Sequence, residues 1–198
     1  MLFAEGDHAL HDRMPDMTNN SQNIILVGPM GAGKTTVGKQ IANQLKKRFV
    51  DVDHELEKRT GVSINLIFEI EKEAGFRARE TAMLAELLSC ENTVIATGGG
   101  IITNKQNREL LKQTEGLVIY LKTEVKHQLK RLRRDKQRPL LQGEGRRERL
   151  LNLARARNPL YEQVSDVAFP SGRTSSYGMA RKIVAYLKDP EKLKKNLK

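Results

Sequence analysis

The residues with the clearest chemistry form a glycine-rich loop near the start of the chain. Eight consecutive residues match the phosphate-binding pattern G-x-x-x-x-G-K-[ST], namely Gly28-Pro29-Met30-Gly31-Ala32-Gly33-Lys34-Thr35. Glycines let the backbone curl so that N–H groups point at anionic oxygens, and a helix N-terminus adds partial positive charge. Lys34 would reach the terminal phosphates and the Thr35 hydroxyl would bind Mg²⁺. The pattern predicts that the chain binds a nucleoside triphosphate.

The flanking residues supply the elements that this loop needs. Residues 24–27 are a short, mostly β-branched run that is typical of a strand buried on both faces. After the loop, Val37, Ile41 and Leu45 recur at positions i, i+4 and i+8, which is one face of a helix. The order of strand, loop and helix favours a phosphate-binding loop over the alternative, a glycine-rich turn that happens to carry a lysine.

Two acids, Asp51 and Asp53, end the next predicted strand, residues 48–53. Because side chains alternate along a strand, both carboxylates are expected on the same side at its carboxyl end, where α/β sheets bind ligands. One carboxylate could serve a metal ion through water, and the other a substrate hydroxyl. The alternative is that Asp53 caps a helix that begins near His54.

Two further segments suit a binding site. Arg77 and Glu80 are three residues apart on a helix expected to begin near Gly75, and the residues alone favour a surface ion pair. Gly98-Gly99-Gly100 follow an apolar strand at residues 93–97. The absence of three Cβ atoms permits either close approach of a ligand to backbone N–H groups or a tight turn. A turn rarely needs three glycines, so we favour the ligand.

The composition indicates one domain with an aliphatic core. The 198 residues include no tryptophan and one cysteine, Cys90, which excludes an internal disulfide and favours a cytoplasmic setting. No segment approaches the roughly 20 apolar residues of a membrane span, so we expect no membrane contact. Residues 1–21 lack the apolar stretch of a signal peptide, and we expect a disordered extension or a start misassigned upstream of Met14 or Met17.

The net charge of +11 invites a nucleic-acid interpretation, so its location matters. Residues 126–149 carry ten Lys and Arg against three acids, and residues 181–198 carry seven against two. A general nucleic-acid binder more typically presents a basic face built from many elements, with aromatic side chains for stacking. We therefore expect no nucleic-acid partner, and interpret residues 189–198 as a solvated basic tail.

Five predicted strands alternate with helical patterns, at residues 24–27, 48–53, 93–97, 117–121 and 166–169. This alternation indicates the α/β class, with a parallel sheet covered by helices on both faces.

Over about residues 23–186 the sequence resembles those of bacterial shikimate kinases. The motifs that carry the resemblance are, in order, the glycine loop, Asp-x-Asp, Gly-Phe-Arg-x-x-Glu, Gly-Gly-Gly, Arg-Pro-Leu-Leu and Arg-Asn-Pro-Leu-Tyr. The order and spacing carry this resemblance more than any motif after the loop. It implies a three-layer P-loop fold with a five-stranded parallel sheet in the order 2-3-1-4-5. It also implies a kinase domain at residues 22–188 with a mobile lid at about residues 132–146. The implied reaction transfers the γ-phosphoryl group of ATP to the 3-hydroxyl of shikimate, on the route to chorismate and the aromatic amino acids.

The resemblance also assigns roles to individual residues. The implied catalytic residues are Lys34, Asp53, which holds the reacting hydroxyl, and Arg138, which closes over the phosphates. The implied shikimate contacts are Asp53, Arg77, Gly98, Gly99, Gly100 and Arg157, with the two arginines on the carboxylate. The implied ATP contacts are Gly31, Ala32, Gly33, Lys34, Thr35, Thr36, Arg131, which packs on adenine, Arg138 and Arg173. Mg²⁺ is implied to contact Thr35 and, through water, Asp51.

Other P-loop proteins fit the sequence less well. A regulatory GTPase needs an N-K-x-D signal, and the nearest string, residues 104–107, lacks the aspartate. An RNA-binding ATPase would explain the charge but not the set of Asp53, Arg77 and Arg157. A gluconate or nucleotide kinase is the nearest rival. We expect a monomer that acts on a small molecule.

Overall fold

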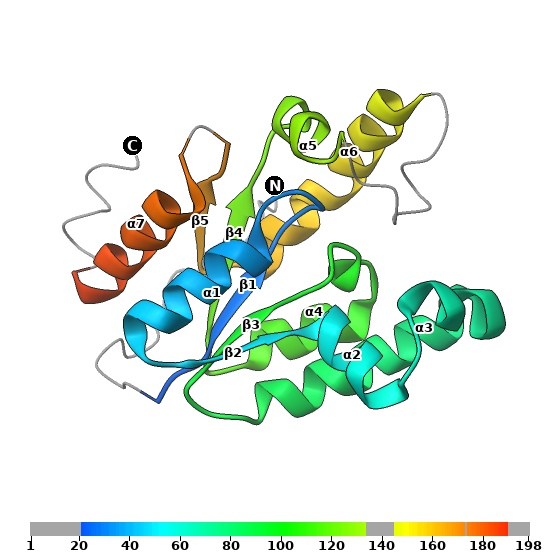
Figure 1. The fold of residues 1–198 in the computed structure, drawn as a ribbon, viewed down its shortest axis with the longest axis horizontal. Coiled ribbons are helices and arrows are strands. Elements are labelled where there is room, and N and C mark those ends of the chain that lie inside the picture. The colour runs from blue at the N-terminus through cyan, green and yellow to red at the C-terminus, as the bar shows by residue number, and fades with distance from the viewer. Residues whose placement is uncertain (1–20, 134–144, 173, 190–198) are drawn as a thin grey trace, which may run out of the picture.

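A computed structural model describes residues 21–133, 145–172 and 174–189 of the chain (Figure 1). The strands are β1 (Ile24–Val27), β2 (Arg48–Asp51), β3 (Thr93–Ala96), β4 (Leu117–Lys122) and β5 (Val167–Pro170). The α-helices are α1 (Lys34–Leu45), α2 (Val52–Thr60), α3 (Ile64–Leu88), α4 (Lys105–Gln113), α5 (Val125–Arg131), α6 (Arg146–Val164) and α7 (Ser176–Lys188). A short 3₁₀ helix, η1 (Ile101–Thr103), follows β3.

The five strands form one parallel sheet in the order β2-β3-β1-β4-β5, which confirms the expected fold class and strand order. The central strand is β1, in which Ile25 pairs with Ile95 of β3 on one side and with Val118 of β4 on the other. All strands run the same way, so their carboxyl ends lie along one edge of the sheet.

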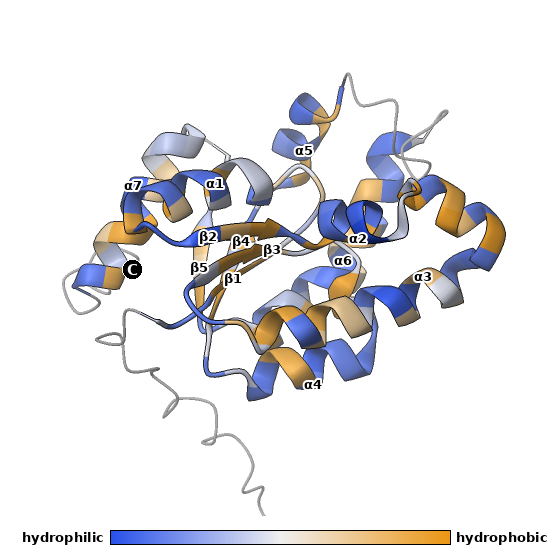
Figure 2. Cartoon of the chain, turned by 60° about the horizontal axis from the view of Figure 1, so that its bottom comes forward, coloured by the Kyte–Doolittle hydropathy of each residue, from blue (hydrophilic) through white to orange (hydrophobic). Residues whose placement is uncertain are grey.

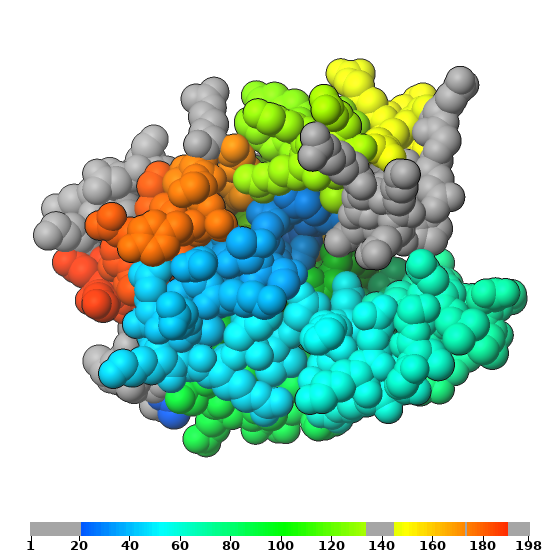
Figure 3. Space-filling view, viewed as in Figure 1, coloured from blue at the N-terminus to red at the C-terminus, as the bar shows by residue number. Residues whose placement is uncertain are grey.

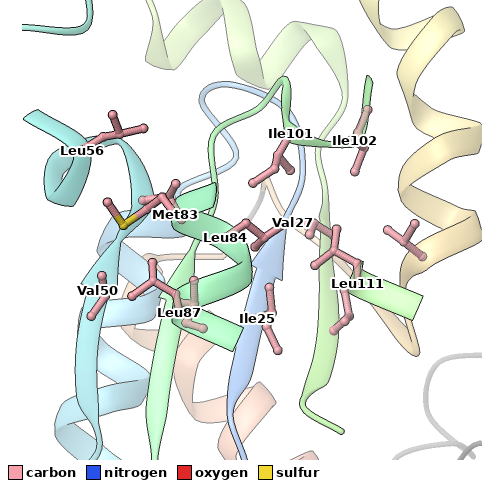
Figure 4. Close-up of a cluster of buried hydrophobic side chains, with 14 of the residues drawn as sticks. Ile25, Val27, Val50, Leu56, Met83, Leu84, Leu87, Ile101, Ile102 and Leu111 are labelled. Carbon is pink, nitrogen blue, oxygen red and sulfur yellow. The ribbon is translucent and has the colours of Figure 1, made fainter. Parts of the chain in front are cut away.

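Helices cover both faces of the sheet because alternate residues of each buried strand point to opposite sides. Ile24 and Leu26 pack against α1 and α7 on one face. Ile25 and Val27 pack on the other face, against residues of α3, α4 and α6. Figure 2 shows the apolar sheet between these helices, and Figure 4 shows Ile25 and Val27 among the side chains of the second face.

Two boundaries differ from those expected. The second strand ends at Asp51 and not at Asp53, because the Asp51 side chain accepts hydrogen bonds that begin α2. The helix that carries Arg77 begins at Ile64 and not near Gly75, since the Ser63 hydroxyl caps its N-terminus by accepting a bond from Leu66 N. This helix is interrupted at Lys72, whose φ of 59° and ψ of −172° are not helical.

The expected terminal segments and lid fall largely outside the described residues. Residues 1–20, 134–144 and 190–198 lie there, so the disordered extension, most of the lid and the basic tail stay predictions. Ser21 is described, and its carbonyl accepts a hydrogen bond of 2.6 Å from Asn92 N. Within the described part of the chain, every helix is too short or too polar to cross a membrane.

Candidate active site

The predicted site residues gather at the carboxyl edge of the sheet. The glycine loop follows β1, Asp51 ends β2, the three glycines follow β3 and Ser171 follows β5. Figure 3 shows α2 and α3 (cyan to teal) on one side of this edge and α5 and α6 (yellow-green to yellow) on the other. The topology therefore brings segments far apart in the sequence to one place, as expected for this class of sheet.

The glycine loop has the backbone shape that the sequence predicts. Gly31 and Gly33 have φ of 74° and 92°, in the left-handed region that favours glycine. Gly33 is the N-cap of α1 and offers no capping side chain, so the first N–H groups of this helix are suited to bind an anion.

The Lys34 side chain folds back over this loop. Its Nζ donates hydrogen bonds to Gly28 O at 2.6 Å and Pro29 O at 3.0 Å, and the residue is buried. These carbonyls hold the ammonium group beside the loop, where it can exchange them for phosphate oxygens. The glycine loop and the Lys34 ammonium group together therefore fit a triphosphate.

Thr35 and Asp51, the two residues expected to serve a metal ion, are in direct contact. Thr35 Oγ1 donates a hydrogen bond of 2.6 Å to Asp51 Oδ2. A hydroxyl and a carboxylate at the mouth of a phosphate-binding loop are hard oxygen donors, which suit Mg²⁺. The neighbouring Thr36 is exposed in the first turn of α1.

The expected geometry of the two acids is wrong, although both lie at the site. Asp51 is the N-cap of α2, and its Oδ1 accepts hydrogen bonds from Asp53 N at 3.1 Å and His54 N at 3.4 Å. Asp53 lies in the first turn of that helix. The first turn of α2, and not strand alternation, therefore sets the direction of the Asp53 side chain, whose carboxylate lies close to Gly98.

The three glycines let other protein groups of the site approach closely. A Cβ built on Gly98 would lie 2.7 Å from Glu80 Oε1 and 2.9 Å from Asp53 Oδ1. A Cβ on Gly99 would lie 3.1 Å from Met30 N, and one on Gly100 2.5 Å from Arg77 Nη2. The missing Cβ atoms thus make room for the protein's own carboxylates, guanidinium and glycine loop, a reason that the sequence did not suggest.

The pair Arg77 and Glu80 is not the surface ion pair that the residues alone favoured. Arg77 Nη1 donates to Glu80 Oε2 at 2.6 Å, and the Glu80 side chain is only 1% exposed. The guanidinium also lies over the buried Phe76 ring, with Cζ 5.2 Å from its centroid. These contacts fix Arg77 beside Gly100.

Glu80 carries unusual electrostatics that sequence reasoning missed. Burial raises its pKa, and this effect outweighs the opposing charges of Arg77 and Arg157, while Asp53 adds a further increase. Glu80 Oε1 has no hydrogen-bond partner among the described residues. The sequence feature that could have pointed to Glu80 as a site residue was its position three residues after Arg77 on the same helix.

Arg157 and Tyr161 approach the same site from α6. Arg157 Nη1 donates to Gly99 O at 3.4 Å, and Tyr161 Oη donates to the same oxygen at 2.5 Å. Sequence reasoning selected Arg157 but gave Tyr161 no role. Its spacing from Arg157 could have indicated Tyr161, because residues four apart on a helix lie on the same face.

Arg131, the last residue of α5, contacts the glycine loop. Its Nη1 donates to Gly31 O at 2.8 Å, Ala32 O at 3.1 Å and Ser171 Oγ at 3.3 Å. These bonds place the guanidinium beside the glycine loop, and its packing on adenine stays a prediction. The other two predicted arginines, Arg138 and Arg173, lie outside the described residues.

Comparison with known proteins shows which proteins this chain is related to. A family model described as shikimate kinase matches residues 30–188. The shikimate kinase of Thioalkalivibrio sulfidiphilus is 52% identical over 170 residues, 86% of this chain and 88% of that protein. The solved structure of shikimate kinase from Acinetobacter baumannii in complex with shikimate is 48% identical, with a TM-score of 0.82, and the match covers 86% of this chain and 95% of that one.

A solved gluconokinase from Sinorhizobium meliloti is 17% identical with a TM-score of 0.52, over 90% of this chain and 97% of that one, which shows a shared fold alone. The two shikimate kinases, by contrast, match in sequence over most of both chains, and the family model runs from Met30 in the glycine loop to the end of the last helix. The chain belongs to the shikimate kinase family.

Proposed function

We propose that this chain transfers the γ-phosphoryl group of ATP to the 3-hydroxyl of shikimate, giving shikimate 3-phosphate and ADP. The observation that carries the proposal is the close approach of the Asp53 carboxylate to Gly98 and of the Arg77 guanidinium to Gly100, one strand away from a phosphate-binding loop. A small acceptor with a hydroxyl and a carboxylate matches this pairing of an acid with a guanidinium.

The donor side binds and orients the triphosphate. The N–H groups at the start of α1 and the Lys34 ammonium neutralise the phosphates, and Arg131 lines the nucleotide beside the loop. Thr35 and Asp51, which are in contact at the mouth of the loop, would hold Mg²⁺. The ion supplies charge neutralisation on the phosphate oxygens.

The acceptor side binds shikimate and positions its hydroxyl. Arg77 and Arg157 carry planar guanidinium groups that suit the carboxylate. Arg77 Nε and Nη2 donate to the exposed Glu73 at 3.4 and 3.3 Å, and this contact is exchanged for the carboxylate of the acceptor. Asp53 orients the 3-hydroxyl and accepts its proton as the new bond from oxygen to the γ-phosphorus forms. The bond from that phosphorus to the bridging oxygen breaks, and the electron pair leaves with ADP.

Two roles rest on the sequence resemblance, because their residues lie outside the described ones. These are the closure of Arg138 over the phosphates and the contact of Arg173 with adenine. Closure of residues 132–146 would keep water from competing with the hydroxyl.

We also propose that the enzyme works as a monomer in the cytoplasm, without a nucleic-acid partner. In support of the compartment, the chain has one cysteine, Cys90, which excludes an internal disulfide, as is typical of proteins of a reducing compartment.

A turnover assay with competing acceptors tests the function. The enzyme, with ATP and Mg²⁺, is offered shikimate, gluconate and nucleoside monophosphates in separate reactions, and ADP formation is followed. We expect kcat/KM for shikimate to exceed the others by at least about 10³-fold, because two guanidiniums and a carboxylate must be matched together. Faster use of gluconate or a nucleotide would overturn the proposal.

A further inference from the structure

The Gly99 carbonyl oxygen is a shared hydrogen-bond acceptor for two side chains of α6. It accepts one hydrogen bond from Tyr161 Oη at 2.5 Å and a longer one from Arg157 Nη1 at 3.4 Å. Both donors project from the same face of the helix, four residues apart. The position of this oxygen therefore depends on Tyr161 and limits where the Arg157 guanidinium lies.

Tyr161 is held rigidly enough to set that position. It is fully buried, and its ring stacks on Tyr120 with centroids 5.1 Å apart and planes at 24°. Burial raises the pKa of Tyr161 well above its ordinary value, so its hydroxyl stays protonated at any working pH and acts as a donor.

The other side of the Gly99 peptide is closed by the glycine loop. A Cβ on Gly99 would lie 3.1 Å from Met30 N and 3.5 Å from Pro29 C. The peptide is thus packed between the loop and the Tyr161 hydroxyl, and a single rigid donor is enough to fix the carbonyl.

We propose that Tyr161 is a positioning residue for the acceptor, whose hydroxyl orients the Gly99 carbonyl so that this oxygen holds the Arg157 guanidinium ready for the acceptor's carboxylate. The inference rests on the proposed function. The weak 3.4 Å contact uses one of the five N–H donors of a guanidinium, so the remaining fork is available to a carboxylate.

The test compares two tyrosines that form one stacked pair. Tyr161→Phe removes the hydroxyl that reaches Gly99, and Tyr120→Phe removes a hydroxyl that donates to Asn158 Oδ1 at 3.2 Å. KM for shikimate, KM for ATP and kcat are measured for both. We expect Tyr161→Phe to raise KM for shikimate roughly tenfold, the size of one lost buried hydrogen bond, with KM for ATP within about twofold. Tyr120→Phe should change neither KM by more than about twofold.

A double variant tests whether the effect of Tyr161→Phe on KM for shikimate depends on Arg157. In an Arg157→Ala enzyme, adding Tyr161→Phe should raise KM for shikimate by less than about twofold, since the group being positioned is already gone. A full tenfold effect in that background, or equal effects on both substrates, would overturn the proposal. Equal effects of Tyr161→Phe and Tyr120→Phe would do so as well.

A rescue pair keeps the test decisive if Tyr161→Phe folds poorly. Tyr161→4-aminophenylalanine restores a donor at the ring tip, and Tyr161→4-fluorophenylalanine has similar size without a donor. The first should bring KM for shikimate near the wild-type value and the second should not, whereas similar values would refute the role. If wild type uses another acceptor and not shikimate, the proposed function fails, and the same comparisons with that acceptor still test the positioning role.

Discussion

The Thr35 hydroxyl donates a hydrogen bond of 2.6 Å to the Asp51 carboxylate, and so joins the start of α1 to the start of α2. Asp51 has a second task, because its other oxygen accepts from Asp53 N and His54 N and begins α2. One side chain thus links the expected metal site to the helix that carries Asp53. Its two tasks can be separated by substitution.

Asp51→Ser should separate capping from metal binding. Serine is a good N-cap, so thermal stability should stay near wild type, while the Mg²⁺ concentration for half-maximal activity rises because the carboxylate is lost. Asp51→Ala should show the same Mg²⁺ dependence and lose about 1 kcal/mol of stability as well. Thermal melts and Mg²⁺ titrations measure the two effects. Unchanged Mg²⁺ dependence in both variants would exclude Asp51 from the metal site.

Asp53→Asn should nearly abolish phosphoryl transfer and leave ATP binding intact. Asp53 faces Gly98 on the acceptor side, and its amide replacement keeps the shape but accepts no proton. Loss of a positioned general base costs about 10²–10⁴-fold in rate. Single-turnover kinetics and ATP titration measure both quantities, and turnover within a few-fold of wild type would remove Asp53 from the reaction.

Arg131→Ala should weaken ATP binding selectively. Its guanidinium bridges Gly31 O, Ala32 O and Ser171 Oγ, so we expect KM for ATP to rise several-fold, with KM for shikimate unchanged. Arg133→Ala is the matched control, because it removes the same charge two residues further along the chain. An equal effect of both variants would mean that the charge of the segment acts collectively and not through Arg131.

Stability should depend on pH through Glu80. Its pKa in the folded protein lies above the ordinary value of 4.5, chiefly because of burial, so the folded state binds this proton more tightly than the unfolded state does. The contribution of Glu80 is therefore greatest at low pH and is lost as pH rises through the folded pKa. Urea unfolding from pH 4.5 upwards should show wild type losing stability relative to Glu80→Gln. A constant difference between the two would contradict the raised pKa.

Local patterns predicted the glycine loop and the five strands, because both depend on residues adjacent in the chain. The strand order came from the family resemblance and not from periodicity. The side-chain direction of Asp53 was wrong because alternation assumed a strand to residue 53, whereas Asp51 ends the strand by capping α2. The burial of Glu80 and the bond from Tyr161 to Gly99 depend on packing between distant segments, which local spacing does not encode.

Product analysis with shikimate and its methyl ester tests the proposed function most directly. After incubation with ATP and Mg²⁺, phosphorus and proton NMR identify which oxygen carries the new phosphate. We expect a single monoester at the 3-oxygen of shikimate. For the methyl ester, which lacks the charge that Arg77 and Arg157 are proposed to bind, we expect kcat/KM lower by at least about 10²-fold. Phosphorylation at another oxygen, or equal use of the ester, would contradict this function and the role of the two arginines.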